Sequence, residues 1–208
     1  MAQLLLIRHG ETVWNREGRF QGAIDVPLSE KGKAEARQLG AYLRDKPLKA
    51  IYSSHLSRAL ETAQAVARHH HLPVQVVEGL GEINMGEWAG HSWEEIWEKW
   101  PELGRQWYNS PPESPPPPGG EYYPDFQARA MEALEEIAAA HASTDLLAVV
   151  THGGVIRAVI NKLLGISWGT RGRFFIKNCS ITPMRWQSRG LVVVEGFNDV
   201  CHMQYPVR

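Results

Sequence analysis

The chain has 208 residues, with 22 Lys and Arg against 23 Asp and Glu, and a formal net charge of −1. This length fits one domain of ordinary size with a sizeable buried core. The balanced charge provides no overall field for holding nucleic acid or an acidic membrane surface, so any recognition of an anion must be local. The hydrophobic content of 43% is ordinary for a globular protein and indicates neither disorder nor a membrane protein.

The expected location follows from the apolar runs and the cysteines. No apolar run approaches the length that spans a bilayer, and the run 4–7 is too short for a signal peptide and has no basic segment before it. Cys179 and Cys201 are far apart and form no C-x-x-C motif, which is typical of free thiols in a reducing compartment. We therefore predict a cytoplasmic protein.

The first third of the chain predicts alternating strands and helices. Ser29 is a suitable N-cap for a helix whose inner face carries Ala36, Leu39 and Leu43. A second helix shows an apolar stripe of helical spacing. The predicted elements are a buried strand at 4–7, the helix after residue 29, a strand at 50–53, a helix from 58 to about 70 and a strand at 74–77.

Between residues 83 and 120 the composition changes to tryptophan-rich and then proline-rich. We read this segment as a small helical lid subdomain followed by a stiff loop at 111–118. After it, we expect a helix at 125–141, a strand at 146–150, a helix at 155–164, and closing strands at 174–183 and 191–197. The alternation predicts an α/β protein, a three-layer α/β/α sandwich around a mainly parallel sheet.

Unusual polar residues stand where the chain leaves the predicted strands. Arg8 and His9 follow the first strand, and Thr151, His152 and Gly153 follow the strand at 146–150. Arg58 opens a helix just after the strand at 50–53, and Glu82 follows the strand at 74–77. Ligands of parallel sheets bind outside the carboxyl ends of the strands, so these groups are expected to share one pocket.

Such a set suits a phosphate ester. Two arginines can hold a dianion with planar, permanently charged forks, a neutral imidazole can attack phosphorus, and a carboxylic acid can protonate the departing alkoxide. Gly153 and Gly154 would present backbone N–H groups at a helix start, and Gly10 would let the backbone approach the ligand. Each residue alone also fits an ordinary reading as a hydrogen-bonded histidine, a solvated arginine or a surface carboxylate.

A series of longer motifs runs along the chain: RHGET at 8–12, WN at 14–15, QG at 21–22, PLSEKGKAEARQLG at 27–40, IYSSHLSRALETA at 51–63, LGEINMGEWAG at 80–90, GGE at 119–121 and VVTHGGVIRAV at 149–159. In this order the motifs resemble those of the histidine phosphatase superfamily, the phosphoglycerate-mutase-like proteins. The resemblance covers nearly the whole chain and implies a single domain over 1–208, with the lid segment inserted in it.

The resemblance also implies roles for individual residues. His9 would carry the phosphoryl group as phosphohistidine, and Glu82 would be the proton donor, with Glu87 as its rival. The residues expected to hold the phosphoryl group are Arg8, Asn15, Gln21, Gly22, Arg58, His152 and the Gly153 amide. No metal and no cofactor is expected, and the implied partner is a small phosphorylated metabolite. The oligomeric state stays open, with a homodimer as one candidate.

Three functions share this pocket. A phosphatase lets water attack the phosphohistidine, a mutase keeps it dry and returns the phosphoryl group, and a silent protein only binds a phospho-ligand. The chain is short, and the only cations between residues 87 and 118 are Lys99 and Arg105, which favours hydrolysis. No expected site residue has been lost, which disfavours the silent binder.

The aromatic residues of the lid segment suggest how the leaving group is selected. Six of them would form an apolar wall around it, or would only pack the small lobe: Trp88, Trp93, Trp97, Trp100, Trp107 and Tyr108. Met85 stands where a histidine would aid phosphoserine-type substrates, which weakens that assignment. We expect no metal at the histidines 69–71 and a spacer role for the proline run.

Overall fold

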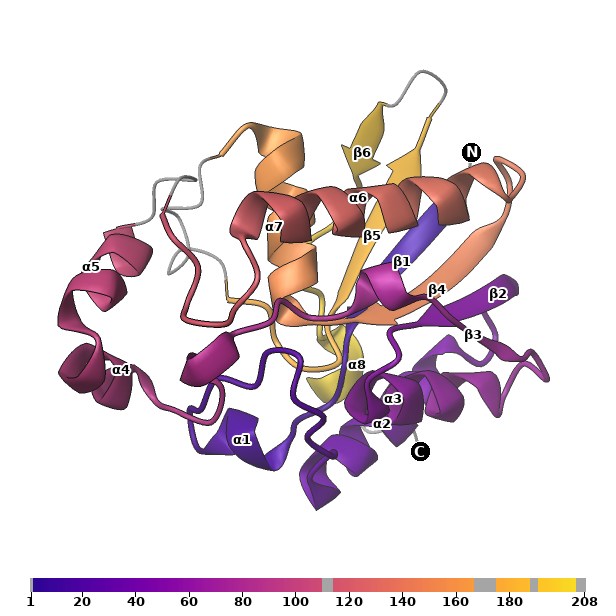
Figure 1. Cartoon of the computed structure of the whole chain (residues 1–208). Helices are drawn as coiled ribbons and strands as arrows, with labels where there is room; N and C mark the ends of the chain where they lie inside the picture. The colour runs from indigo at the N-terminus through magenta and orange to yellow at the C-terminus, as the bar shows by residue number, and fades with distance from the viewer. Residues whose placement is uncertain (1, 110–113, 167–174, 188–190, 205–208) are drawn as a thin grey trace.

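The computed structural model describes residues 2–109, 114–166, 175–187 and 191–204 (Figure 1). Its centre is a six-stranded sheet in the order β3-β2-β4-β1-β5-β6. The four strands β1 to β4 pair in parallel, whereas β5 and β6 are antiparallel. The strands are β1 (Gln3–Arg8), β2 (Leu48–Ser53), β3 (Val74–Val76), β4 (Leu146–Thr151), β5 (Ile181–Trp186) and β6 (Val192–Val194).

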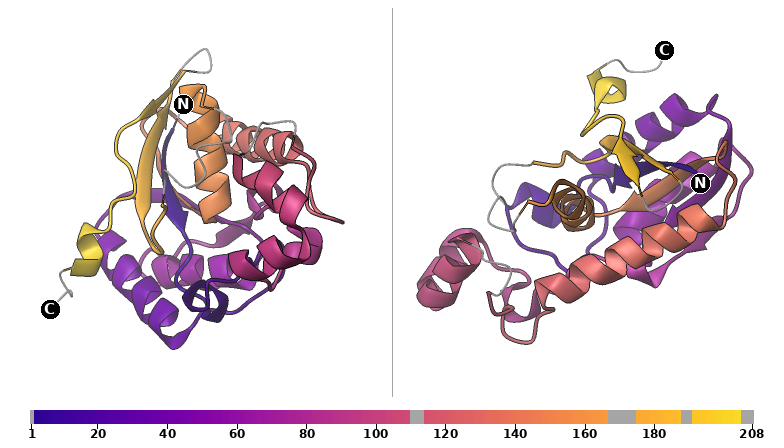
Figure 2. Two further views of the ribbon diagram at one scale, coloured as in Figure 1. Left: turned by 90° about the vertical axis from the view of Figure 1, so that its left-hand side faces the viewer. Right: turned by 90° about the horizontal axis from the view of Figure 1, so that it is seen from above.

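Helices cover both faces of this sheet, as the two further views in Figure 2 show. The described helices are α1 (Val13–Arg16), α2 (Glu30–Leu43), α3 (Ser57–Ala67), α4 (Trp93–Lys99), α5 (Pro101–Asn109), α6 (Tyr123–Ala139), α7 (Gly153–Leu164) and α8 (Cys201–Gln204), with 3-10 turns η1 (Glu78–Leu80) and η2 (Gly86–Trp88). Helices α2 and α3 pack on one face, and α6 and α7 pack on the other. The predicted α/β/α sandwich with a mainly parallel sheet is confirmed.

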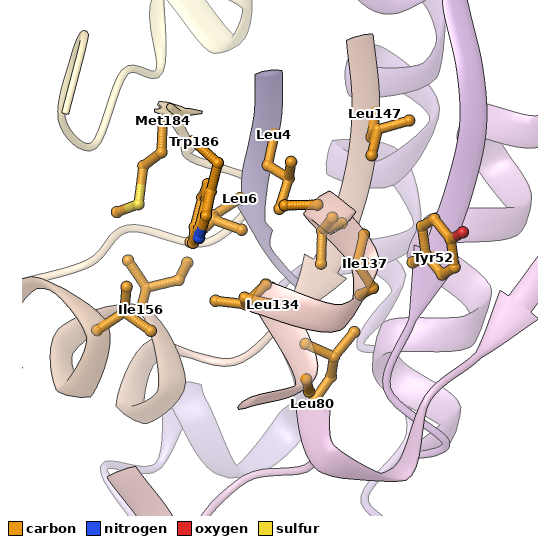
Figure 3. Packing of buried hydrophobic residues seen from close by; sticks show 14 of the residues in the cluster. Leu4, Leu6, Tyr52, Leu80, Leu134, Ile137, Leu147, Ile156, Met184 and Trp186 are labelled. Carbon is orange, nitrogen blue, oxygen red and sulfur yellow. The ribbon is translucent and has the colours of Figure 1, made fainter. Parts of the chain in front are cut away.

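The two cores follow from the alternation of side chains along each strand. In β1, Leu4 and Leu6 point into the core beneath α6 and α7, whereas Leu5 and Ile7 point into the core beneath α2 and α3. Figure 3 shows the first core, where Leu4 and Leu6 lie close to Leu134 of α6. Because both faces are covered, the strand is apolar throughout, as the sequence indicated.

The predicted strand at 174–183 is wrong in its first part. Residue 174 lies outside the described residues, and 175–180 form a loop before β5 begins at Ile181. Cys179 has a φ of 52°, a left-handed turn in which its N–H donates to the Arg8 carbonyl at 3.0 Å. This turn ends the pairing with β1. Strand β6 is likewise shorter than the predicted 191–197.

The segment 83–120 contains η2, α4 and α5, and it lies at one end of the molecule, beyond the sheet (Figure 1). Its side chains and residues of α6 and α7 form an apolar cluster around the fully buried Trp88. Ser92 caps α4 by accepting from the Glu95 N–H, and the Glu95 carboxylate accepts from the Ser92 N–H in return. None of the helices in the described ranges combines the length and apolar character that crossing a bilayer requires.

Replacing Leu6 by Ala tests the core beneath α6 and α7. Leu6 is fully buried, so the variant should lose about 2–5 kcal/mol of unfolding free energy through lost burial and a residual cavity. Leu164→Ala is the control, because Leu164 is exposed, and its effect should stay within about 0.5 kcal/mol. Urea titration measures both, and equal effects would contradict the assigned core.

Candidate functional site

The carboxyl ends of β1, β2 and β4 lie at one edge of the sheet. Arg8 at the end of β1 is in register with Thr151 at the end of β4, and Ser53 of β2 is in register with Val150. The pairing continues one bond further, since the His9 N–H donates to the Thr151 carbonyl at 3.0 Å. The first residues beyond β1 and β4, His9 and His152, are therefore neighbours.

A cavity of about 220 Å³ opens at this edge. The predicted residues that line it are Arg8, His9, Asn15, Gln21, Gly22, Arg58, Glu82 and Gly153. His152 is fully buried directly behind them, with its ring centroid 5.2 Å from that of His9. Thr151 has another task, because its hydroxyl donates to the Leu80 carbonyl at 2.7 Å and ties β4 to the segment before Glu82.

The hydrogen bonds of His9 leave one ring nitrogen for chemistry. His9 is 3% exposed, and its Nδ1 lies 2.7 Å from the Gly10 carbonyl oxygen, which can only accept. Nδ1 therefore carries the proton, and Nε2 keeps its lone pair. Burial, followed by the charges of Arg8 and Arg58, lowers the pKa of His9 well below its usual value. The ring is neutral at physiological pH, which suits a nucleophile.

His152 is oriented from two sides. The Arg58 Nε donates to its Nδ1 at 3.3 Å, so the proton of the neutral ring lies on Nε2, which donates to the Ser54 hydroxyl at 2.8 Å. Burial is the largest cause that lowers the pKa of His152 well below its usual value, and the charge of Arg58 acts in the same direction. The buried pair of rings thus adds no positive charge to the two arginines.

Arg58 and Arg8 are fixed by backbone carbonyls. Arg58 is 1% exposed and donates to the Gly22 and Ile24 carbonyls, each at 2.7 Å. Arg8 donates to the Ile176 carbonyl, and its buried Nε has no hydrogen-bond partner among the described residues. Burial lowers the pKa of Arg8 to about 10, against the opposing effect of Glu82, so the guanidinium stays charged at neutral pH. Two such fixed cations favour an anionic ligand.

Glu82 is held by two backbone amides, its own neighbour's and one at the start of α7. Its Oε2 accepts from the Gly154 N–H at 2.9 Å, and its Oε1 accepts from the Ile83 N–H at 3.0 Å. A Cβ on Gly154 would lie 2.1 Å from Oε1, so only glycine leaves room for this carboxylate. The rival Glu87 is exposed and does not line the cavity.

Arg129 of α6 holds the backbone around Glu82, a contact that the sequence did not reveal. Its guanidinium donates to the carbonyls of Gly79, Gly81 and Glu82 at 3.0, 2.8 and 3.1 Å. It also forms a two-pronged ion pair with Glu121, at 2.7 and 2.9 Å. An arginine inside an amphipathic helix gives no sequence signal for such a role.

The glycine of the RHG motif serves the fold. A Cβ on Gly10 would lie 2.6 Å from the Gly32 carbonyl oxygen, and Gly10 does not line the cavity. The expected close approach is therefore between Gly10 and the start of α2, instead of between Gly10 and a ligand. Asn178 is a further residue that sequence reasoning missed, and its amide donates to the His9 carbonyl at 3.0 Å and to Asn15 Oδ1 at 3.3 Å.

Only one of the six aromatic residues proposed as a wall lines the cavity. Trp107 does so, whereas Trp88 is fully buried in the small lobe with Trp93, Trp100 and Trp107 around it. Trp97 and Tyr108 contact each other on the outside of that lobe. The other apolar residues of the cavity are Phe20, Ile83, Met85, Phe175 and Ile176. All five tryptophans thus pack against one another in the lobe, and Trp107 also lines the cavity.

The remaining histidines give no sign of a metal centre. In the parts of the chain that are described, no group of three or more His, Cys, Asp and Glu side chains is arranged to hold a metal ion. Cys179 and Cys201 are both free thiols, and burial raises the pKa of Cys179 well above its usual value.

Known proteins are similar to this chain in sequence or in structure. A phosphoserine phosphatase 1 of Hydrogenobacter thermophilus is 35% identical over 98% of this chain and 95% of its own length. A probable phosphoglycerate mutase of Salmonella choleraesuis is 33% identical over 99% and 97%. The crystal structure of a phosphoserine phosphatase of Entamoeba histolytica in complex with 3-phosphoglyceric acid superimposes with a TM-score of 0.86, at 30% identity over 98% and 100%.

The family assignment rests on nearly the whole chain. The model of the histidine phosphatase superfamily (branch 1) matches residues 4–199, which include all of the sheet except Gln3 and all of the described residues that line the cavity. With this match and the similarity to the relatives above, the chain belongs to the histidine phosphatase superfamily.

Proposed function

We propose that the protein is a metal-independent phosphatase that hydrolyses small phosphorylated metabolites through a phosphohistidine on His9, with Glu82 as proton donor. Its family and the names of its relatives make it a phosphoric monoester hydrolase. The mechanism and the substrate class are our inference. One observation carries it: a neutral His9 with a free Nε2 faces a cavity that Arg8, Arg58 and Glu82 also line.

In the first step, the phosphoryl group binds beside Arg8 and Arg58, and His9 Nε2 attacks phosphorus. The bond between phosphorus and the ester oxygen breaks as the N–P bond forms, and protonated Glu82 gives its proton to the departing alkoxide. The two guanidiniums stabilise the charge on the phosphoryl oxygens. The hydrogen bond to the Gly10 carbonyl fixes the tautomer of His9 in which Nε2 carries the lone pair. The attack therefore needs no prior proton transfer.

In the second step, water replaces the alcohol. The Glu82 carboxylate accepts a proton from the water as its oxygen attacks phosphorus, the N–P bond breaks, and inorganic phosphate leaves with His9 neutral again. Glu82 thereby returns to its protonated form. The hydrogen bonds from Ile83 and Gly154 keep this carboxylate at the cavity in both steps.

The cations of the segment 83–120 support hydrolysis over transfer. Lys99 lies against His91, Arg105 is paired with Glu102, and neither residue lines the cavity. A mutase has to hold its released product and exclude water, for which basic residues in the lid are useful. The mutase alternative predicts interconversion of 2- and 3-phosphoglycerate with little free phosphate, and the silent binder predicts affinity without either reaction.

Further parts of the proposal concern the whole chain. We infer that 1–208 is one domain with 83–120 as a lid, because the apolar cluster around Trp88 also contains residues of α6 and α7. A cytoplasmic location is supported by the two free cysteines. A homodimer stays a prediction.

The nucleophile is tested with His9→Ala and p-nitrophenyl phosphate. The wild type should release phosphate in the presence of a chelator and be inhibited by vanadate, and the variant should lose all measurable turnover because no N–P bond can form. His69→Ala, on the exposed side of the helix end, should keep wild-type rates. Appreciable residual activity of the His9 variant would refute its assignment.

The proton donor is tested by changing the leaving group. With an alkyl phosphate, Glu82→Gln should lower kcat by about 10²–10⁴-fold, because the alkoxide leaves only when protonated. The effect on p-nitrophenyl phosphate should be much smaller, since p-nitrophenolate is stable without a proton. Glu87→Gln is the matched control and should behave as wild type with both substrates. Equal losses with the two substrates would count against Glu82 as the acid.

The low pKa values of His9 and His152 predict a loss of stability in mild acid. In the folded protein both rings stay neutral below the ordinary value of 6.5, whereas the unfolded chain takes up protons there. The unfolding free energy should therefore fall as the pH drops through 6.5 toward the folded-state pKa values, by up to about 1.4 kcal/mol per residue and pH unit.

Urea titrations at about pH 7.5 and about pH 5.5 measure this loss of unfolding free energy, to which each imidazole with a lowered pKa contributes the uptake of one proton on unfolding. The difference between the two conditions should be smaller for His152→Gln than for the wild type, because the variant has one perturbed imidazole fewer. Equal differences for both proteins would mean that the pKa of His152 is not lowered in the folded state.

A further inference from the structure

Asn178 joins the nucleophile to a residue that is expected to bind the phosphoryl group. Two hydrogen bonds start from its Nδ2, which donates to the His9 carbonyl at 3.0 Å and to Asn15 Oδ1 at 3.3 Å. An NH2 group has two hydrogens, and these two bonds use both of them. One side-chain amide thus ties the backbone of His9 to a side chain that lines the cavity.

The turn at 177–180 fixes the place of Asn178. The Arg8 N–H donates to the Ser180 carbonyl at 3.2 Å, and the Cys179 N–H donates to the Arg8 carbonyl at 3.0 Å. The residues after Asn178 are therefore hydrogen-bonded to the last residue of β1. This attachment brings the Asn178 side chain to the first residue beyond the strand, which is His9.

The orientation of both amides follows from their backbone partners. A carbonyl oxygen only accepts, so the end of the Asn178 side chain that faces His9 is the NH2 group. A backbone N–H only donates, so the end of Asn15 that lies 3.2 Å from the Thr12 N–H is the oxygen. Asn15 Oδ1 thus accepts from two donors, and its NH2 group remains for a ligand in the cavity.

The NH2 group is the end of the Asn15 amide that suits a phosphoryl group. Phosphoryl oxygens are anionic and accept hydrogen bonds, whereas a flipped Asn15 amide would turn its own oxygen toward them and repel them. A flip would also set the NH2 group of Asn15 against the donors of Thr12 and Asn178. Each of these two donors therefore makes the flipped orientation less favourable.

We propose that Asn178 is a positioning residue, which holds the Asn15 amide with its NH2 group toward the phosphoryl oxygens. This rests on the proposed function and adds a residue to its site. The His9 carbonyl is the anchor that keeps Asn178 in the orientation required. Because that carbonyl also accepts from the Cys179 N–H at 3.3 Å, the backbone of His9 keeps a partner when Asn178 is replaced.

A double-mutant cycle with Asn15 tests the proposal. Asn178→Ala should lower kcat/KM for p-nitrophenyl phosphate by about 3–10-fold, the range for the loss of one net hydrogen bond. Asn15→Ala should lower it by about 10–100-fold, because a donor to a charged oxygen is lost. In the Asn15→Ala background, Asn178→Ala should change kcat/KM by less than about twofold, because no amide is left to orient.

The effect of Asn178→Ala should not depend on the leaving group. An alkyl phosphate and p-nitrophenyl phosphate present the same phosphoryl oxygens to Asn15, so their kcat/KM values should fall by the same factor. The inhibition constant of inorganic phosphate should rise by about 3–10-fold as well. A contribution to the acid step at Glu82 would instead affect the alkyl phosphate more.

Asn198→Gly is the matched control, because Asn198 holds the same turn without touching His9 or Asn15. Its Oδ1 accepts from the Lys177 N–H at 2.7 Å, and its Nδ2 donates to the Phe175 carbonyl at 2.8 Å. Its φ is 55°, which glycine adopts without strain. Whatever activity this variant loses through the turn, the factor should be the same in the wild-type and Asn15→Ala backgrounds.

Two outcomes would overturn the assignment. Equal factors for Asn178→Ala in both backgrounds would show that Asn178 acts on the turn or on His9 instead of through Asn15. An unchanged kcat/KM in the wild-type background would remove the positioning role altogether. Failure of the proposed function is distinguishable, because the wild type would then release no phosphate from p-nitrophenyl phosphate. The same cycle, measured on the dissociation constant of inorganic phosphate, would still decide whether Asn178 acts through Asn15.

Discussion

The parallel pairing of β1 with β4 is the constraint on which the site depends. It aligns Arg8 with Thr151 and continues through the hydrogen bond from the His9 N–H to the Thr151 carbonyl, so that two histidines 143 positions apart in sequence become neighbours. Neither strand could slip by one residue without exchanging the two cores, because Leu4 and Leu6 serve one face and Leu5 and Ile7 the other. The hydrophobic cores therefore fix the spacing of the imidazoles.

The positive charges of Arg8 and Arg58 at this edge of the sheet are surrounded mainly by neutral groups. Arg8 and Arg58 are held by backbone carbonyls, which carry no compensating charge, and the adjacent imidazoles are neutral because the same cations and burial lower their pKa values. The net positive charge is left for a ligand to balance. In the proposed mechanism a phosphate dianion would supply that balance, and both guanidiniums already line the cavity that His9 faces.

Two sets of contacts support the cavity: one holds Glu82 in place, and the other packs the lobe formed by the segment 83–120. Arg129 and Gly154 hold Glu82 from two helices, α6 and α7, one through the backbone and one through the carboxylate. The tryptophans of the segment 83–120 contribute mainly by packing around Trp88, in an apolar cluster that this lobe shares with α6 and α7. Of the five tryptophans in this lobe, Trp107 is the one that lines the cavity.

The sequence by itself determined the layer architecture, the alternation of strands and helices along the chain, and the set of polar residues at the strand ends. It could do so because apolar runs and helix caps are local patterns. It missed Arg129 and Asn178, and it assigned Gly10 to the ligand, because each of those contacts joins segments far apart in the chain. Which tryptophan reaches the cavity, and where β5 begins, were likewise decided only by tertiary structure. The physical reason is that side-chain type is local, whereas direction and distance are set by packing between elements.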